Sequence, residues 1–517
     1  MGARDFEGQA LSGADGGHRH EADVLVIGGG PAGTWAAISA AAQGARVVLA
    51  DKGFCGTSGA TAPSGTGLWH VSPDGSARAD AKASRLAMGG HLAEHAWMDR
   101  VLAQTWDNVE RLKDWGYPFP SDDEGQLRCT SLQGPEYMRL MRKRVKSSGA
   151  RILDHSPALE LLVDAQGTVG GATGVNRQTG ETWVVRAGAV VIATGGCAFL
   201  SKALGCNVLT GDGQLMAAEV GAAMSGMEFS NAYGLGPAFS SVTKSLFYNW
   251  ATFYDRDGQA IEGAGSSRGR SVIAQTLQTQ PVYACIDRAD AQIRAWMRTA
   301  QPNFFVSFDR QGIDPFTQHF PVTLRLEGTV RGTGGLNLVD GSCATSVAGL
   351  YAAGDAATRE LICGGFTGGG SHNAAWALSS GFWAGGVAIA TRGAEGCDSQ
   401  AVVSAVQAEV FPYERNWFRE GPVLEASLAR LDALWTRLRH SAPAACASEA
   451  VRAREAAAML ATARWMYRSA LQRTETRGMH RRREHAALDP TQRHRLLSGG
   501  LDEVWVRAQP LTEALTP

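Results

Sequence analysis

Short apolar runs separated by helical stretches dominate the first half of the chain. Residues 23–27 (DVLVI) form a continuous apolar run, a helix of small residues follows, and residues 46–51 (RVVLAD) form a second run. Two further runs, in AGAVVIATGGCAF (187–199) and TSVAGLYAAGDAAT (345–358), end in glycine-containing sequence. Apolar runs without alternation are typical of strands buried on both faces of a parallel sheet. The pattern therefore predicts an α/β fold.

Beyond about residue 400 the pattern becomes helical. EASLARLDALWTRLRH (425–440) places leucines and a tryptophan at helical spacing, and residues 449–472 form a second long stretch with almost no helix breaker. Apolar side chains at this spacing more often pack against other helices than hold a cofactor. The sequence therefore predicts a helical C-terminal region.

A glycine-rich loop joins the first apolar run to the helix after it. Gly28, Gly30 and Gly33 have the G-x-G-x-x-G spacing, and Asp51 ends the second run eighteen residues after Gly33. Glycines at these positions permit a tight turn, a close approach of the backbone to a pyrophosphate, and close packing of helix on strand. The helix N-terminus stabilises phosphate charge, and the acid accepts hydrogen bonds from ribose hydroxyls. The element predicts a dinucleotide site and leaves FAD and NAD both open.

Composition is that of an ordinary globular protein. The 517 residues are 44% hydrophobic and 19% charged, with a net charge of −1. This balance argues against nucleic acid or an anionic membrane as the main partner. No apolar stretch approaches the ~20 residues needed to span a bilayer. The polar first twenty residues predict a disordered tail and not a signal peptide.

The nine cysteines include no C-x-x-C pair. Iron–sulfur and zinc sites need clustered cysteines, so the sequence predicts no metal site, and any iron–sulfur cluster would belong to a partner. The odd, scattered set fits a reducing cytoplasm better than a disulfide framework.

Several distant segments resemble one family. A Ser/Thr/Gly loop (52–67) follows the second apolar run, and the sequences ATGG, TGDG and AAGD follow later. RTETRGMHRRREHAALDP (473–490) is similar to the E-S-R-G-A-H-x-R-x-D-x-P signature of the succinate dehydrogenase/fumarate reductase flavoprotein superfamily. L-aspartate oxidase and the adenylylsulfate reductase flavoprotein belong to the same superfamily. The matches extend from about residue 22 to residue 490, and the resemblance implies FAD as the cofactor.

The resemblance also implies an architecture. It consists of a three-layer, Rossmann-like α/β domain for FAD, an inserted α+β capping domain and a C-terminal helical domain. The expected bounds are a tail at 1–20, the FAD-binding domain at 21–229 and 331–398, the capping domain at 230–330, and the helical domain at 399–517. In support of the insertion, aromatic residues replace the glycine-rich pattern after residue 229, and PVYACIDR (281–288) resembles a strand of the family's capping domain.

Cofactor-binding residues follow from the resemblance position by position. Asp51 would hold the adenosine ribose, and Asp212 and Asp355 would accept hydrogen bonds from ribose or ribityl hydroxyls. Buried acids need such partners. The remaining positions would line the nucleotide or the flavin: Gly28, Gly30, Pro31, Ala32, Gly33, Lys52, Thr57, Ser58, Gly59, Gly65, Gly67, Ala193, Thr194, Gly195, Gly354, Asn373 and Ala374.

Several family members attach FAD covalently through a histidine in the loop after the second strand. Residues 52–67 contain no histidine, and His70 lies too late in the chain to match. We therefore expect non-covalent FAD, with a lower flavin potential than a histidyl-linked flavin has.

In the family, a hydride passes between flavin N5 and a substrate carbon beneath the capping domain, and an arginine transfers the matching proton. Arg270, in GRSVIAQTL (269–277), takes that position, and Arg268 is an alternative. Arginine is an unusual acid because its pKa lies above ~12, unless the surroundings lower it. Ser271 stands where the family has an acidic neighbour, which leaves the proton relay open. The alternative role of Arg270 is a surface or phosphate contact.

Two residues that clamp substrate carboxylates in dicarboxylate enzymes of the family are replaced. Val330 stands at the histidine of the H-x-x-M-G-G segment, and Gly368 at the arginine of N-R-L-G-G-N-S. Loss of these charge-assisted contacts predicts weak binding of succinate or fumarate. Arg331 is a candidate anion contact or a structural ion pair. His372 is a candidate donor to the substrate, a helix cap or a flavin contact.

These features predict an FAD-dependent oxidoreductase for a non-dicarboxylate organic substrate, acting by dehydrogenation or reduction next to an activating group. Aromatic residues of the cap, Phe247, Tyr248, Trp250 and Tyr254, form a candidate lid or core. Residues 244–259 and the missing clamp resemble the adenylylsulfate reductase branch, which implies a separate ferredoxin-like iron–sulfur partner. An oxidase that passes electrons to O2 is a further alternative. The expected location is the cytoplasm, with no transmembrane segment.

Overall fold

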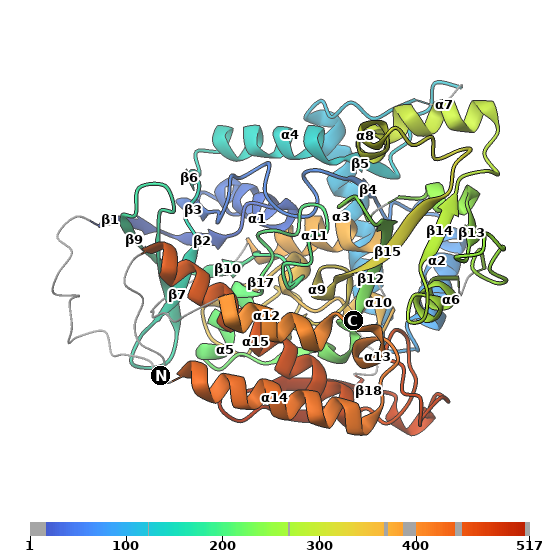
Figure 1. Cartoon of the computed structure of the whole chain (residues 1–517). Coiled ribbons are helices and arrows are strands. Elements are labelled where there is room, and N and C mark those ends of the chain that lie inside the picture. The colour runs from blue at the N-terminus through green and yellow to red at the C-terminus, as the bar shows by residue number, and fades with distance from the viewer. Residues whose placement is uncertain are drawn as a thin grey trace.

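The computed structural model describes residues 17–121, 124–243, 245–266, 269–366, 371–385, 400–439 and 447–511 (Figure 1). Within these ranges no helix combines the length and the hydropathy that crossing a bilayer requires. The fold is a mixed α/β fold with helices α14 and α15 gathered near the C-terminus. The predicted fold class is therefore confirmed.

A five-stranded parallel sheet, in the order β17-β10-β2-β3-β6, forms the centre of the molecule. The strands are β2 (Val24–Ile27), β3 (Val47–Ala50), β6 (Arg151–Leu153), β10 (Val190–Ile192) and β17 (Leu350–Ala352). Every residue of β2, β3 and β10 is buried. These strands read as unbroken apolar runs because both faces of the sheet are covered.

Helices cover one face of this sheet. α1 (Pro31–Ala42) packs on β2 and β3 and contacts α4 (Gly134–Ser147) and α11 (Ser371–Ala384). A Cβ atom at Gly381 would lie 2.2 Å from the carbonyl oxygen of Ala32, so α1 and α11 approach with their backbones almost in contact.

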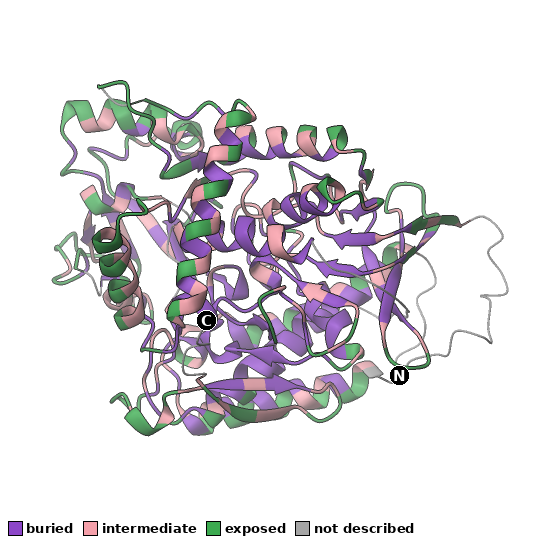
Figure 2. Ribbon diagram, turned by 180° about the vertical axis from the view of Figure 1, so that it is seen from behind, coloured by how far each residue is buried: buried purple, intermediate pink, exposed green. Residues whose placement is uncertain are grey.

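A second sheet, in the order β1-β9-β8-β7, covers the opposite face through contacts of β8 with β10 and of β9 with β2. Its strands are β1 (His18–Ala22), β7 (Ala158–Val163), β8 (Val169–Val175) and β9 (Thr182–Ala187). The resulting three layers show as a continuous buried interior in Figure 2, with exposed residues at the periphery.

An antiparallel sheet of order β12-β15-β14-β13 forms a separate body beside the parallel sheet, to the right in Figure 1. Its strands are β12 (Ala232–Pro237), β13 (Thr252–Tyr254), β14 (Val282–Cys285) and β15 (Phe320–Glu327), and its helices are α6 (Gly269–Thr276), α7 (Ala291–Ala300) and α8 (Pro302–Gln311). We call this body, residues 232–327, the cap. In the core of the cap, Phe247 packs edge-on against Phe304, with 5.2 Å between the ring centres. Tyr254 stacks on His319, with 4.0 Å between the ring centres.

The C-terminal region is formed by α12 (Gln400–Val410), α14 (Gly421–Arg439) and α15 (Ala447–Gln472). It also contains β18 (His494–Gly499) and β19 (Trp505–Pro510), which the sequence did not indicate. β18 pairs with β11 (Met224–Ser225), so the end of the chain joins a sheet begun in its first half.

Buried ion pairs fasten this region to the rest of the molecule. Arg473 contacts Glu228 at 2.8 Å and Glu475 at 3.0 Å, and Arg477 contacts Glu475 at 2.5 Å. All four side chains are at most 1% exposed. Buried charges are tolerated when they are paired in this way. Arg473, Glu475 and Arg477 of the C-terminal signature therefore have a structural role in holding this region to the rest of the molecule.

Candidate active site

A cavity of about 1060 Å³ opens at the carboxyl edge of the parallel sheet. Gly28, Asp51, Ala193 and Gly354, which follow β2, β3, β10 and β17, all line it. The carboxyl ends of parallel strands meet at one edge, so segments far apart in the sequence form one wall. Residues of the cap, together with Gly478, Met479 and Arg481 of the C-terminal region, contribute further walls. The volume is comparable with the upper end of the ~300–1,000 Å³ range of ligand sites, which suits a large ligand.

The glycine-rich loop leaves open space at the start of α1. A Cβ atom at Gly30 would meet no atom within 4 Å, whereas one at Gly28 would lie 2.3 Å from the carbonyl oxygen of Ala193. Gly28 also has φ +111°, which favours glycine. The N-terminus of α1 thus faces a cradle without side chains, a favourable place for a pyrophosphate.

Asp51 is held rigidly at the end of β3. Its carboxylate accepts hydrogen bonds from Gly29 N at 2.6 Å, Gly53 N at 2.7 Å and Ser58 Oγ at 2.7 Å. These donors orient the carboxylate, and each carboxylate oxygen can accept more than one bond. Ribose binding by Asp51 stays a prediction for which the geometry is suitable.

Lys52 links the nucleotide end to the C-terminal helices. Its Nζ donates to Thr210 Oγ1 at 2.6 Å and to Asp212 Oδ2 at 2.7 Å, and it contacts Glu455 Oε1 of α15 at 2.8 Å. Burial acts to lower the pKa of Lys52, but the Asp212 and Glu455 carboxylates outweigh it and raise that pKa. The sequence did not indicate that Glu455 lies near the cofactor site, because the pattern of its helix predicts only contacts with other helices.

Eighteen of the twenty residues expected at the cofactor line the cavity: Gly28, Gly30, Pro31, Ala32, Asp51, Lys52, Ser58, Gly59, Gly65, Gly67, Ala193, Thr194, Gly195, Asp212, Gly354, Asp355, Asn373 and Ala374. Gly33 lies beneath the loop, where a Cβ atom would approach Gly28 O to 1.7 Å. Thr57 is exposed, and its hydroxyl donates to Phe54 O at 3.4 Å instead of facing the cavity.

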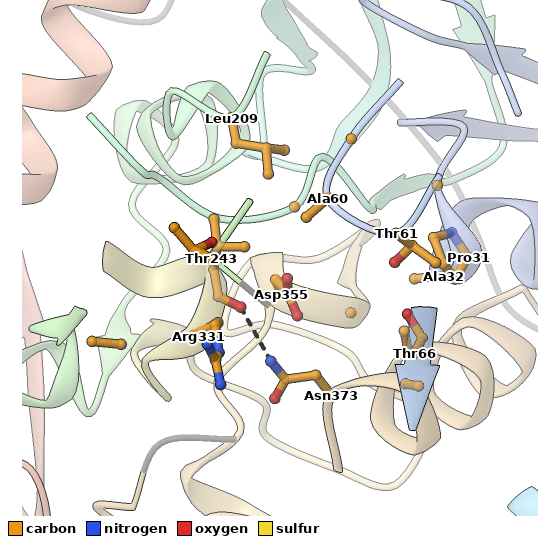
Figure 3. Close-up of a pocket in the computed structure, with 18 of the residues that line it drawn as sticks. Pro31, Ala32, Ala60, Thr61, Thr66, Leu209, Thr243, Arg331, Asp355 and Asn373 are labelled. Carbon is orange, nitrogen blue, oxygen red and sulfur yellow. Dashed lines mark hydrogen bonds between the residues drawn. The ribbon is translucent and has the colours of Figure 1, made fainter. Parts of the chain in front are cut away.

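Buried polar atoms in the cavity wall fit a flavin nucleotide. Thr194 Oγ1 and Asn373 Oδ1 are buried and have no hydrogen-bond partner among the described residues. Asn373 Nδ2 donates to Val330 O at 3.2 Å, the dashed line in Figure 3. Asp355 is paired with the buried Arg359. Because such atoms are rarely left unpaired, hydroxyl and ring N–H groups of FAD are suitable partners.

Arginines gather at the end of the cavity nearest the cap. Arg270 lies in the first turn of α6, and Arg331 ends α9 (Gly328–Arg331) and contacts Glu327 Oε2 at 3.3 Å. Thr243 Oγ1 donates to the other oxygen of Glu327. Figure 3 shows Thr243, Arg331, Asp355 and Asn373 on one side of the cavity, across from Pro31, Ala32, Thr61 and Thr66.

The surroundings of Arg270 change its acidity. Arg270 lines the cavity, and its side chain remains exposed to solvent. Partial removal from water by the surrounding protein, and then the Arg331 guanidinium, lower the pKa of Arg270 to about 10, although Glu327 opposes them. Arg268, the alternative arginine, lies outside the described residues.

Arg481 also lines this end of the cavity. Its guanidinium donates to Ser271 Oγ and lies 6.0 Å from the centre of the Trp417 ring. Sequence reasoning missed Arg481 because it occupies the unspecified position in the family signature; its place next to two further arginines was the available signal.

His372 does not line the cavity, contrary to its candidate role as a donor to the substrate. It is fully buried in the first turn of α11, with its ring centre 4.7 Å from that of Trp69. Burial, and then Arg85, lower the pKa of His372 to about 3, so it stays neutral near pH 7. Val330, by contrast, lines the cavity and is 2% exposed. Gly368, the other replaced position, lies outside the described residues.

Two family models match the chain: an FAD binding domain at residues 23–233 and the fumarate reductase flavoprotein C-terminal region at residues 412–508. L-aspartate oxidase of Mycobacterium tuberculosis is 28% identical, and the alignment covers 94% of this chain and 96% of that protein. L-aspartate oxidase of Streptomyces coelicolor is also 28% identical, with 65% of this chain and 63% of that protein covered. A fumarate reductase flavoprotein subunit of M. tuberculosis is 26% identical over 43% of this chain and 40% of that protein.

Solved structures share the fold at low identity. A mutant FrdA chain of Escherichia coli quinol fumarate reductase superposes with a TM-score of 0.81 at 20% identity, covering 97% of this chain and 98% of that chain. Adenylylsulfate reductase from Archaeoglobus fulgidus gives a TM-score of 0.77 at 18% identity, with the same coverage of 97% and 98%. Together with the family matches and a cavity that fits a flavin nucleotide, these similarities show that the chain belongs to the succinate dehydrogenase/fumarate reductase flavoprotein superfamily of FAD-dependent oxidoreductases.

Proposed function

We propose that this flavoenzyme interconverts an organic substrate and its dehydrogenated form, next to an activating group, and that the substrate is not a small dicarboxylate. Val330 carries the proposal, because it lines the cavity where the family pattern has a carboxylate-binding histidine. An isopropyl group cannot donate to a carboxylate, so a dicarboxylate loses one charge-assisted hydrogen bond, worth ~1.5–3 kcal/mol.

The substrate is proposed to bind between the cap and the nucleotide-binding edge. Residues of α6, α7 and the turn before β13 line the same cavity as the glycine-rich loop. FAD, when bound, supplies or accepts the hydride.

Arg270 is the proposed proton-transfer residue. With a pKa of about 10, it remains protonated at neutral pH but releases a proton at less cost than an ordinary arginine. In the reducing direction its guanidinium gives a proton to the substrate carbon next to the one that receives the hydride. In the dehydrogenating direction the deprotonated group accepts that proton.

Anaerobic reduction of the holoenzyme's flavin tests this function. We expect a monocarboxylate, ketone or amine from a substrate panel to bleach the visible flavin band, with succinate and L-aspartate slow or inactive. The dithionite-reduced enzyme, challenged with unsaturated counterparts, covers the reverse direction. Efficient turnover of succinate, fumarate or L-aspartate, or no reaction with any organic compound in either direction, contradicts the proposal.

O2 is a candidate electron acceptor because the full-length curated relatives are L-aspartate oxidases. Stoichiometric peroxide formed during aerobic turnover supports an oxidase. Negligible peroxide together with rapid flavin reoxidation by an added ferredoxin favours an iron–sulfur partner instead.

A further inference from the structure

A hydrogen bond joins the cap to the C-terminal segment at the wall of the cavity. Arg481 donates to Ser271 Oγ in the first turn of α6, and both residues line the cavity. Ser271 directly follows Arg270, the proposed proton-transfer residue. Consecutive residues of a helix share one backbone, so a contact that fixes Ser271 also fixes the point from which the Arg270 side chain extends.

The position of α6 depends on such contacts. The helix has eight residues, and a helix this short is held in place by tertiary interactions. Ile273 and Ala274 are 1% and 0% exposed and anchor the helix in the apolar core. The bond to Ser271 ties the first turn of the helix to a segment outside the cap.

The chain that carries Arg481 is itself fixed outside the cap. Arg481 O accepts from Arg419 N at 3.3 Å, and Arg483 N donates to Arg419 O at 2.9 Å. Arg419 is fully buried, and its guanidinium donates to the carbonyl oxygen of Glu228 at 2.6 Å. Glu228 precedes the cap and belongs to the buried ion pairs that fasten the C-terminal region. Arg481 therefore extends from a rigid base.

An aromatic pair supports the Arg481 side chain. The guanidinium carbon lies 6.0 Å from the centre of the Trp417 ring, and that centre lies 5.2 Å from the centre of the Tyr233 ring. Both aromatic residues are buried, and Tyr233 Oη donates to the carbonyl oxygens of Val410 and Phe411 at 3.0 Å each. An arginine side chain has much rotamer freedom, which a supporting ring restricts. The pair thus favours the conformation that reaches α6.

We propose that Arg481 is a positioning residue for the proton transfer of this enzyme. By holding Ser271, it fixes the first turn of α6 relative to the nucleotide end of the cavity, so that Arg270 meets the reacting carbon. Because a misplacement of ~1 Å can cost ~10²-fold in rate, one hydrogen bond at this point affects catalysis. The inference rests on the proposed function, since it takes Arg270 as the proton-transfer residue.

Hydrogen–deuterium exchange of the holoenzyme tests the contact without turnover. Ser271→Ala removes the acceptor and leaves the other contacts of Arg481 in place, whereas Arg481→Met removes the donor and keeps a long side chain. We expect the amides of residues 269–277 to exchange about 10- to 100-fold faster in each variant, the range for a hydrogen bond to a charged group, and no faster in the double variant. Arg483→Met is the matched control and should exchange like the wild type, because Arg483 is two positions away, half exposed and paired with Glu420.

Stopped-flow reduction of the flavin, by the substrate that bleaches it, separates positioning from binding. Ser271→Ala and Arg481→Met should lower the reduction rate at saturating substrate by about 10- to 100-fold, with the substrate Kd within about twofold of the wild-type value. Ser271→Thr keeps the hydroxyl and should restore most of the rate. The double variant should be no slower than the slower single variant, because both changes break the same contact.

Unchanged exchange of α6 in Ser271→Ala overturns the inference, as do additive losses of rate in the double variant. A loss of substrate affinity as large as the loss of rate would make the two residues substrate contacts and also overturns it. Failure of the proposed function is a distinct result. A wild-type rate in Arg270→Gln refutes that function and this inference together, whereas unchanged exchange of α6 refutes the inference alone.

Discussion

Glu360 is a buried carboxyl group whose ionisation should control stability. It begins α10 (Glu360–Cys363) and is fully buried; Oε2 accepts from Ser225 Oγ at 2.7 Å, and Oε1 has no hydrogen-bond partner among the described residues. Arg495 Nε is 3.9 Å away. Burial, and then the negative Glu228, raise the pKa of Glu360 from 4.5 to about 7, although Arg495 opposes them.

The sign of the effect follows from proton binding in the two states. Between pH 4.5 and about 7 the folded protein holds a proton on Glu360 that the unfolded chain has released. The stabilisation is therefore complete below pH 4.5 and is lost as the pH rises towards 7. The difference between a pKa of 4.5 in the unfolded chain and one of about 7 in the folded protein corresponds to a loss of ~3 kcal/mol. For a chain of this length, with ~2.1 cal/mol/K of unfolding entropy per residue, that loss lowers the Tm by about 3 °C.

Glu360→Gln removes the titration and keeps the side-chain shape, with a carbonyl oxygen to accept from Ser225. We expect the Tm of Glu360→Gln minus that of the wild type to rise by about 3 °C between pH 5 and pH 8. Flavin fluorescence during thermal unfolding, with excess FAD, measures it. The exposed Glu425→Gln on α14 is the control and should show no trend. A difference independent of pH would mean that Glu360 does not titrate in this window, and it would refute the reasoning.

Further variants test the cavity. Val330→His should tighten succinate binding by about tenfold at pH 6, measured by the perturbation of the flavin spectrum. An unchanged affinity would mean that position 330 is not where the family's histidine binds a carboxylate. Arg270→Gln should slow flavin reduction at saturating substrate by about 10²–10⁴-fold in stopped flow; a rate near that of the wild type would remove Arg270 from proton transfer. Gly30→Ala should yield folded protein with weakened FAD affinity, because its Cβ enters open space, whereas Gly28→Ala should fail to fold stably, because its Cβ meets Ala193 O. Acid precipitation should release all flavin into the supernatant, because residues 52–67 contain no histidine; flavin retained in the pellet would contradict non-covalent binding.

The nucleotide end of the site was largely predictable from the sequence. Gly28, Gly30 and Asp51 lie where strand–loop–helix spacing places them, because local backbone requirements determine those positions. Asp212 and Asp355 also line the cavity, as predicted. Only the structure shows that Asp212 pairs with Lys52 and that Asp355 pairs with Arg359. Side-chain pairing depends on rotamers and on neighbours from other segments, which no single segment specifies.

His372 shows the opposite outcome. Its place at the start of a helix beside a glycine-rich loop suggested a role at the substrate, but the first turn of α11 directs the ring onto Trp69. A helix has a period of ~3.6 residues, so neighbouring side chains diverge and Asn373, not His372, lines the cavity.

By itself, the sequence determined the α/β class, the dinucleotide loop and the family, and it predicted the loss of a carboxylate-binding residue at Val330. These depend on periodicity, glycine spacing and residue identity, all of which are local properties of the chain. The tertiary structure alone decided that Arg270, Arg331 and Arg481 share one cavity with Leu246 and Trp296. Arg331 and Arg481 are 150 positions apart in the chain, and only the packing of the cap and the C-terminal segment around the carboxyl edge of the sheet brings them together.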